Sequence, residues 1–208
     1  MLTAAPPHLL WRLITDFGDS AVTVPLALFC VAYLLLARRH RAALALALSS
    51  GGAALVILLL KLALQSCLPG RNGALLTSPS GHAALSASVY GGLALLLSQG
   101  LPRRPLLLTA TALLVAGIAA SRLALKAHTP PEILLGLLVG GGFALLMARL
   151  ICGEPPFHPQ RGSLLALAAL ILLATYGLRS PAEQIIRHMA HGLHGQAIWC
   201  DQGSGAFR

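Results

Sequence analysis

Long, nearly continuous apolar runs are the feature that most constrains this chain. They are rich in Leu and Ala and fall near residues 21–37, 43–65, 83–99, 105–120, 133–151 and 163–178. A helix needs about 20 apolar residues to cross a bilayer core of about 30 Å. Backbone in lipid must satisfy its own hydrogen bonds, and these runs are too long for the strands of a barrel. The sequence therefore predicts an all-α integral membrane bundle of six transmembrane helices.

The composition excludes the common classes of water-soluble chain. Hydrophobic residues make up 56% of the 208 residues and charged residues 10%, whereas soluble domains carry about 25% charged residues. Disordered chains need low hydrophobicity and high charge. The net charge of +9 does not indicate nucleic acid as a partner, because the 15 Lys and Arg are scattered over short polar gaps. Membrane proteins place positive charge in such gaps in any case.

The positions of the runs divide the chain into three parts. These are an N-terminal interfacial segment (1–20), a six-helix membrane domain (21–178) and a C-terminal surface tail (179–208). Within the first part, apolar residues between His8 and Asp19 recur at roughly helical spacing. That pattern fits either a helix on the membrane surface or a partly ordered extension.

The C-terminal tail leaves two questions open. His188, His191 and His194 are spaced three apart, but no fourth ligand is evident, so a short amphipathic surface helix is favoured over a metal site. Cys67 and Cys200 fall on the same predicted face. A disulfide between them is an open alternative that the sequence does not establish.

Polar gaps between the runs alternate between two faces of the predicted bundle. The gap at 38–42 contains three Arg in four residues, and short Arg-rich loops favour the cytoplasm. Both termini and the gaps at 66–82 and 121–132 fall on the other face. We therefore expect both termini to lie outside the cytoplasm.

Ionisable and small polar residues gather on that second face. Four predicted helix ends carry them, namely Lys61, Ser78–His82, Ser121–Arg122 and His128 with Glu132. Ionisable residues at membrane depth are costly and usually functional. Their joint occurrence on one face indicates a site.

These residue types suit the binding and transfer of a phosphate. Ser78 can cap the third helix, and the N–H groups at such a helix start bind anions. Gly81 lets an anion approach the backbone closely. Lys61 and Arg122 supply positive charge. His128 and His82 can act as nucleophile and proton donor near neutral pH.

A structural interpretation competes for part of this cluster. Thr129 to Glu132 reads T-P-P-E, which is also a capping box with proline at the first helical position. Capping and orientation of His128 are equally good explanations of Glu132 taken alone. No set of Asp, Glu and His ligands is visible near these residues, so we expect neither a metal nor another cofactor.

These residues resemble the signature of the type 2 phosphatidic acid phosphatase superfamily, membrane-bound branch. That signature reads K-x6-R-P, then P-S-G-H, then S-R-x5-H-x3-D. The first part stands here as Lys61, six residues and Leu68-Pro69, and the second as Pro79–His82. The third is Ser121-Arg122, five residues, His128, three residues and Glu132. The resemblance covers roughly residues 20–178.

The resemblance implies a metal-independent phosphatase that acts on a phosphomonoester or pyrophosphate of a lipid. It implies that His128 attacks phosphorus and forms a phosphohistidine, that Glu132 orients its imidazole and that His82 protonates the leaving group. The phosphate oxygens would then be held by Lys61, Ser80, Gly81 and Arg122.

Two positions depart from the family signature. Leu68 stands where the family has Arg, and Arg71, three residues later, is the candidate replacement. Glu132 replaces Asp, which keeps the charge and lengthens the arm by one methylene. An alternative function follows from the missing Arg: a catalytically weak or inactive relative that binds or translocates lipid.

The lipid itself is left open by the sequence. Phosphatidic acid, phosphatidylglycerol phosphate, a polyprenyl diphosphate and lipid A phosphates share the group that this site would hold. The Leu-, Ala- and Arg-rich composition favours a bacterial inner membrane, with the catalytic face periplasmic. The bilayer and the lipid phosphate are then the expected partners.

Overall fold

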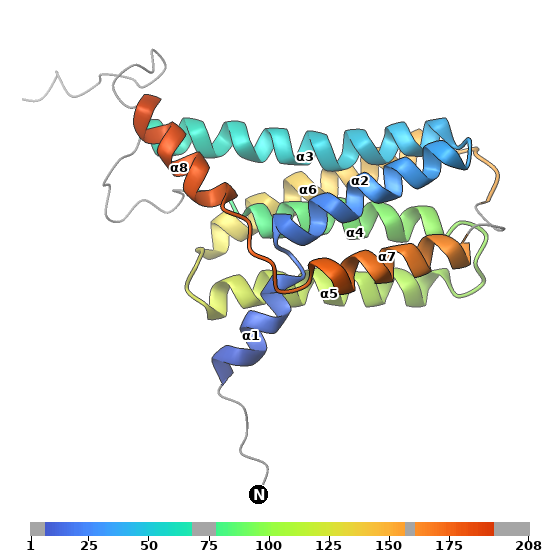
Figure 1. The fold of residues 1–208 in the computed structure, drawn as a ribbon, viewed down its shortest axis with the longest axis horizontal. Helices are drawn as coiled ribbons and strands as arrows, with labels where there is room; N and C mark the ends of the chain where they lie inside the picture. Colours follow the sequence, from blue (N-terminus) through green and yellow to red (C-terminus); the bar gives the residue numbers. More distant parts are fainter. Residues whose placement is uncertain (1–6, 68–77, 157–160, 194–208) are drawn as a thin grey trace, which may run out of the picture.

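The computed structural model describes residues 7–67, 78–156 and 161–193, and this part of the chain is all-α. Its helices are α1 (Pro7–Asp16), α2 (Ser20–Leu36), α3 (His40–Cys67), α4 (Gly81–Leu97), α5 (Arg104–Ala124), α6 (Pro130–Leu150), α7 (Arg161–Thr175) and α8 (Ala182–Leu193). Helices α2 to α7 run roughly along one axis, and α1 and α8 lie at one end of the bundle (Figure 1). The predicted all-α class is therefore confirmed for the described residues.

The six predicted spans coincide with α2 to α7, but only part of that prediction is supported. Four helical stretches are long and apolar enough to cross a membrane: His8–Leu36, His40–Gln65, Arg104–Ala124 and Pro130–Leu150. The apolar helices Gly81–Leu97 and Gly162–Thr175 are shorter than a full span. The chain thus has membrane-spanning character, and a count of six crossings is not established.

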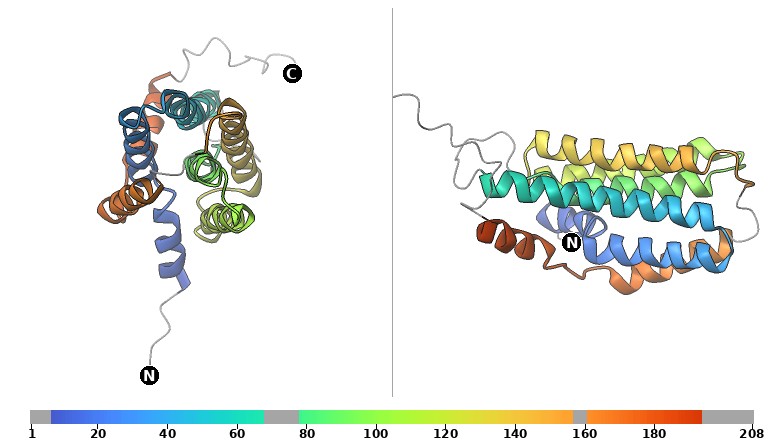
Figure 2. Two further views of the ribbon diagram at one scale, coloured as in Figure 1. Left: turned by 90° about the vertical axis from the view of Figure 1, so that its right-hand side faces the viewer. Right: turned by 90° about the horizontal axis from the view of Figure 1, so that it is seen from above.

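Helix α4 occupies the centre of the bundle. It contacts α2, α3, α5 and α6, and the end-on view in Figure 2 shows the other helices around it. Its sequence is rich in Ala, Ser and Gly, and most of its residues are buried. Small side chains let neighbouring helix backbones approach closely. In lipid, the van der Waals packing that results holds helices together, because no hydrophobic effect acts between them there.

The closest of these contacts joins α6 to α4 through two glycines of one GxxxG. A Cβ on Gly140 would lie 2.1 Å from the carbonyl oxygen of Ala84, and one on Gly136 would lie 2.5 Å from that of Ser80. Both obstacles are backbone atoms, so no side-chain movement relieves them. Gly136 therefore also sets the distance between α6 and the first residues of α4.

We expect Gly140→Ala to lower the thermal stability of the purified protein. Overpacking of a tight contact costs about 1–3 kcal/mol, and here the backbones must separate. Gly141→Ala is the matched control, because a Cβ there meets nothing within 4 Å. Thermal unfolding in detergent measures both. Equal melting temperatures for the two variants would contradict the packing assigned to Gly140.

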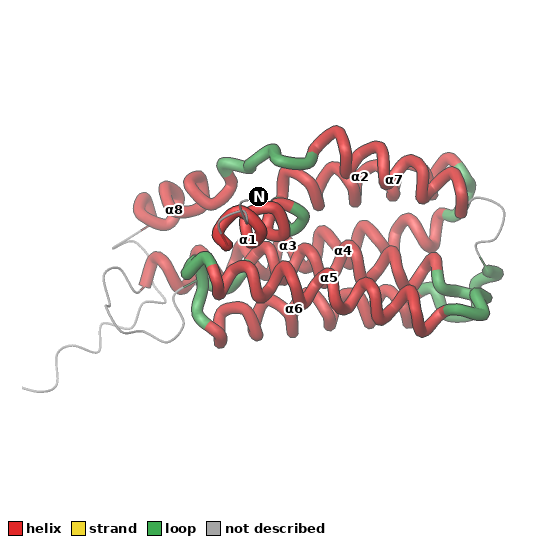
Figure 3. Tube along the Cα trace, turned by 90° about the horizontal axis from the view of Figure 1, so that it is seen from below, coloured by secondary structure: helices red, strands yellow, loops and turns green. Residues whose placement is uncertain are grey.

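The bundle has one end with short loops and one end rich in ionisable residues. The turns between α2 and α3 and between α4 and α5 lie at one end (Figure 1). The tube view in Figure 3 shows the other end, where the start of α6 and the end of α5 lie, with α1 and α8 at the same end. The alternation of faces that the sequence predicted brings the start of α4 to this same end.

Candidate active site

Glu132 connects three pieces of backbone at this end of the bundle. Its Oε2 lies 3.0 Å from Nδ1 of His128 and accepts a hydrogen bond of 3.1 Å from the backbone N–H of Thr129. Its Oε1 accepts from the N–H of Ser78 at 2.8 Å. The residue is 3% exposed. Capping of α6 and contact with His128 were competing explanations of Glu132, and the structure contains both.

His128 lies in the short connection between α5 and α6. Its backbone N–H bonds to the carbonyl of Arg122, and Glu132 contacts Nδ1, so two neighbours determine the direction of the ring. Burial lowers the pKa of His128 below its ordinary value, and nearby Arg122 and Lys61 act in the same sense. The hydrogen bond between His128 and Glu132 raises that pKa, but the pKa of His128 stays below its ordinary value.

Helix α4 starts two residues later than the sequence predicted. The prediction that Ser78 caps this helix is wrong: Ser80 is the N-cap, and its hydroxyl accepts from the N–H of Ala83. The N–H of Ser80 donates to the carbonyl of Glu132 at 3.0 Å. Gly81 and His82 are therefore the first residues of α4, where helix N–H groups attract anions.

The two cations reach the site from α3 and α5. Lys61 is 3% exposed and forms an ion pair with Glu183 of α8. Arg122 donates from Nη1 to the hydroxyl of Thr15 at 3.2 Å. Its buried Nε has no hydrogen-bond partner in the described part of the chain. Both cations thus retain donors that suit an anion.

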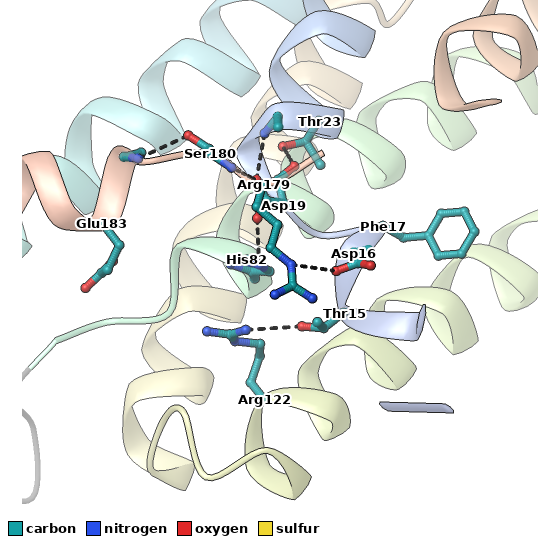
Figure 4. A network of polar contacts seen from close by, with 12 residues as sticks. Thr15, Asp16, Phe17, Asp19, Thr23, His82, Arg122, Arg179, Ser180 and Glu183 are labelled. Carbon is teal, nitrogen blue, oxygen red and sulfur yellow. Dashed lines mark hydrogen bonds and ion pairs between the residues drawn. The ribbon is translucent and has the colours of Figure 1, made fainter. Parts of the chain in front are cut away.

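Asp19 links His82 to the start of α2 and to Ser180, in the segment before α8, as Figure 4 shows. Its Oδ2 lies 3.7 Å from Nε2 of His82. Its Oδ1 accepts from the N–H of Ala21 at 2.8 Å, as the N-cap of α2, and from the N–H of Ser180 at 3.1 Å. One carboxylate therefore holds together α2, α4 and the segment that leads into α8.

A cavity of about 430 Å³ joins these residues. Its polar lining consists of Asp19, Ser20, Lys61, Gly81, His82, Arg122, His128, Ser180 and Glu183. Most of the remaining wall is apolar and comes from α2, α3, α4 and α8. A second cavity of about 340 Å³, with a more polar lining, shares Arg122, His128 and Glu183 with the first. The arrangement suits a ligand with an anionic head and an apolar body.

Sequence reasoning missed two acidic residues of this site. Asp19 precedes Ser20 at the start of an apolar run, which is an N-cap pattern, but that pattern does not predict a contact with His82. Glu183 lies in the tail, and its local sequence carries no signal for Lys61, which is 122 positions away. Burial raises the pKa of Glu183, but Lys61 and Arg187 lower it by more, so this carboxyl is ionised at neutral pH.

Several predicted residues lie outside the description or outside the site. Leu68, Arg71, His194 and Cys200 fall outside the described residues, and with them the suggested role of Arg71 and the suggested disulfide. His188 is exposed on α8. Within the described ranges, no group of three or more His, Cys, Asp or Glu is placed to hold a metal ion.

Comparison with known proteins agrees with the family resemblance. The model of the PAP2 superfamily matches residues 62–152, which include the start of α4, Arg122, His128 and Glu132. Over 190 residues the chain is 32% identical to the "uncharacterized 22.5 kDa protein in cps region" of Klebsiella pneumoniae, covering 86% of this chain and 90% of that protein. No solved structure matches the chain.

Proposed function

The chain belongs to the PAP2 superfamily, and from this membership we propose that it is a metal-independent lipid phosphate phosphatase that works through a phosphohistidine. The observation that supports this most is the single cavity wall shared by Lys61, His82, Arg122 and His128. These residues come from four separate segments, so their convergence has no explanation in local helix structure. The superfamily generally comprises phosphatases.

In the proposed first step, Nε2 of neutral His128 attacks phosphorus. Glu132 contacts Nδ1 at 3.0 Å, so Nε2 is the nitrogen left to bond to phosphorus. The carboxylate of Glu132 would also stabilise the positive charge that develops on the ring. The bond from phosphorus to the leaving oxygen breaks, and His82 donates a proton to that oxygen. Asp19, 3.7 Å from His82, would stabilise the protonated form of this ring.

In the proposed second step, water attacks the phosphohistidine. His82, now neutral, accepts a proton from the water, the bond to Nε2 breaks and inorganic phosphate leaves. Throughout, Lys61, Arg122 and the N–H groups near Ser80 and Gly81 would stabilise charge on the phosphate oxygens. A Cβ on Gly81 would lie 4.0 Å from Cε of Lys61, so a side chain there would occupy part of the space proposed for phosphate.

The apolar part of the cavity wall favours a lipid substrate over a small soluble ester. Val24 of α2, Ile57 and Leu58 of α3 and Leu85 of α4 line it. Binding of an acyl or polyprenyl chain there would remove apolar surface from water. Phosphatidic acid, phosphatidylglycerol phosphate, polyprenyl diphosphates and lipid A phosphates all remain candidates.

A phosphate-release assay over these four lipids, with purified protein in mixed micelles, tests the proposal. We expect release from at least one of them in the presence of EDTA, since the proposed chemistry uses side chains alone. Release that EDTA abolishes and Mg²⁺ or Zn²⁺ restores would contradict the metal-independent mechanism. Lipid binding without release would support the alternative of a non-catalytic relative, which the Leu68 position favours.

We expect the acidic limb of the pH profile of kcat/KM to lie below pH 6.5. The nucleophile must be neutral, and the pKa of His128 lies below its ordinary value of 6.5 because of burial. Activity should therefore persist as the pH falls through 6.5 and decline only below it. Profiles for two esters with different phosphate pKa values separate the enzyme group from the substrate. A limb at or above 6.5 with both esters would contradict this assignment.

We propose that the site opens to the periplasm of a bacterial inner membrane. Arg38, Arg39 and Arg41 lie at the turn from α2 to α3, at the short-loop end, and short Arg-rich loops favour the cytoplasm. At the other end, Lys61 and Arg122 line the cavity. Their positions are explained by the proposed site, so these two cations are not evidence for a cytoplasmic face.

Thiol labelling in intact cells measures this orientation. Cys152 is exposed at the short-loop end, and Gln184 is exposed on α8 at the site end. Two variants each keep a single cysteine: one keeps native Cys152, and the other has Gln184→Cys with all native cysteines replaced. We expect an impermeant reagent to label the Gln184→Cys variant and not the Cys152 variant. The opposite pattern would reverse the proposed topology.

A further inference from the structure

The ion pair between Lys61 and Glu183 places a carboxylate where the proposed function requires a phosphate. Lys61 is buried, and the Glu183 side chain is 40% exposed. Both residues line the same cavity as His128 and Arg122. An ammonium in this position cannot hold its carboxylate partner and also give its full charge to a substrate phosphate, because the two anions would repel each other at close range.

Helix α8 places this carboxylate and also covers the cavity. Glu183 lies in the first turn of α8, and Ile185, Ile186 and Met189 of the same helix contribute to the apolar wall. Helix α8 packs along the end of α3, as Figure 2 shows in the view from above. Ile185 and Met189 are about half exposed, at 53% and 49%. The helix is therefore seated over the cavity without being embedded in the bundle.

Glu183 has a second cationic partner on its own helix. Nε of Arg187 lies 3.5 Å from its Oε1, one helical turn away. A carboxylate that leaves Lys61 therefore remains paired with Arg187 in partly exposed surroundings. Release of Glu183 from the cavity does not require an unpaired charge in an apolar environment, which would be costly.

We propose that Glu183 is an internal competitor for the substrate phosphate and that α8 is a lid which the substrate displaces. This inference rests on the proposed function, since it assigns Lys61 to the phosphate. In the free protein, Glu183 neutralises buried Lys61. On binding, the phosphate replaces the carboxylate on Lys61, and the lipid chain takes the place of the apolar side chains of α8 in the cavity.

The competing explanation is a structural ion pair that only keeps Lys61 in position. The two explanations predict opposite changes in affinity. An internal competitor weakens phosphate binding, so its removal tightens binding without slowing the chemistry. A residue that positions Lys61 strengthens binding or turnover, so its removal weakens one or the other.

The test compares Glu183→Gln with the matched variant Glu154→Gln. Both remove one carboxylate, and Glu154 lies beyond Leu150, the last residue of α6, whereas Glu132 of the site lies in the first turn of that helix. The dissociation constant for inorganic phosphate comes from thermal unfolding in detergent at increasing phosphate concentration. We expect it to fall about fivefold to tenfold in Glu183→Gln and to stay within about twofold of wild type in Glu154→Gln.

Arg187→Gln provides a second variant with the opposite expected sign. It keeps the ion pair with Lys61 and removes the cation that shares Glu183, so we expect phosphate binding to weaken about twofold or more. Arg187 is largely exposed, with a side-chain exposure of 67%, so the variant should fold even if Glu183→Gln does not.

Unchanged or weaker phosphate binding in Glu183→Gln would overturn the inference, and so would tighter binding in Arg187→Gln. These constants do not depend on turnover. A wild-type protein that binds phosphate in this manner but releases none from any lipid would contradict the proposed function alone. Where turnover is measured, Glu183→Gln should lower KM by the same factor.

Discussion

Replacing His128 with alanine is expected to abolish phosphate release while the bundle stays folded. The proposed bond to phosphorus forms at this ring, and His82, a second imidazole that lines the cavity, has the separate proposed role of proton donor. Removal of a catalytic nucleophile lowers kcat by about 10⁴-fold or more. Phosphate release from the substrate that the wild type prefers measures the effect.

His188→Ala is the matched control for this variant. His188 is exposed on α8 and does not line the cavity, so its removal should leave turnover within about twofold of wild type. Thermal unfolding of both variants measures whether the fold is intact, and we expect melting temperatures close to that of the wild type. If His128→Ala released phosphate at the wild-type rate, the phosphohistidine mechanism would be untenable.

Replacing Glu132 with glutamine should lower kcat by about 10³- to 10⁴-fold, comparable to the loss of the acidic member of a hydrolase triad. Glutamine keeps the length of the side chain but removes the charge that stabilises His128 as it becomes cationic. It also presents only one acceptor oxygen where Glu132 contacts Ser78, Thr129 and His128. An unpaired buried N–H adds about 1–3 kcal/mol of destabilisation.

Glu132→Asp tests the charge of this side chain separately from its length. Aspartate is the residue of the family signature, and it keeps the charge but shortens the arm by one methylene. We expect it to retain more activity than the glutamine variant, because the charge beside His128 matters most for turnover. Wild-type turnover in Glu132→Gln would mean that Glu132 serves only as the cap of α6.

The helices of this protein follow from local sequence. Each of the six apolar runs became a helix, α2 to α7, because lipid leaves the backbone no partner except itself. The alternation of polar gaps then places Lys61, the start of α4, Arg122 and His128 at one end. Which end each of these motifs occupies depends only on the number of apolar runs between them. The sequence therefore predicts the location of the site.

Details of the helix ends depended on partners distant in sequence. Ser78 and Ser80 are both suitable N-caps, and Pro79 directly after Ser78 made Ser78 the predicted cap. The N–H of Ser80 donates to the carbonyl of Glu132, and the N–H of Ser78 donates to its carboxylate. These two contacts hold the segment before α4 so that Ser80 is the cap. Glu132 serves as cap of α6 and as partner of His128 through one oxygen, Oε2, while Oε1 accepts from the N–H of Ser78.

The sequence by itself determined the all-α class, the membrane character and the residue types gathered at one end, since all of these depend on hydrophobicity and spacing along the chain. Only the tertiary structure decided that Asp19 contacts His82 and that Glu183 pairs with Lys61. These pairs join segments more than 60 positions apart. Their formation depends on how α1, α2 and α8 pack at the end of the bundle, and the local pattern of a helix carries no information about its distant neighbours.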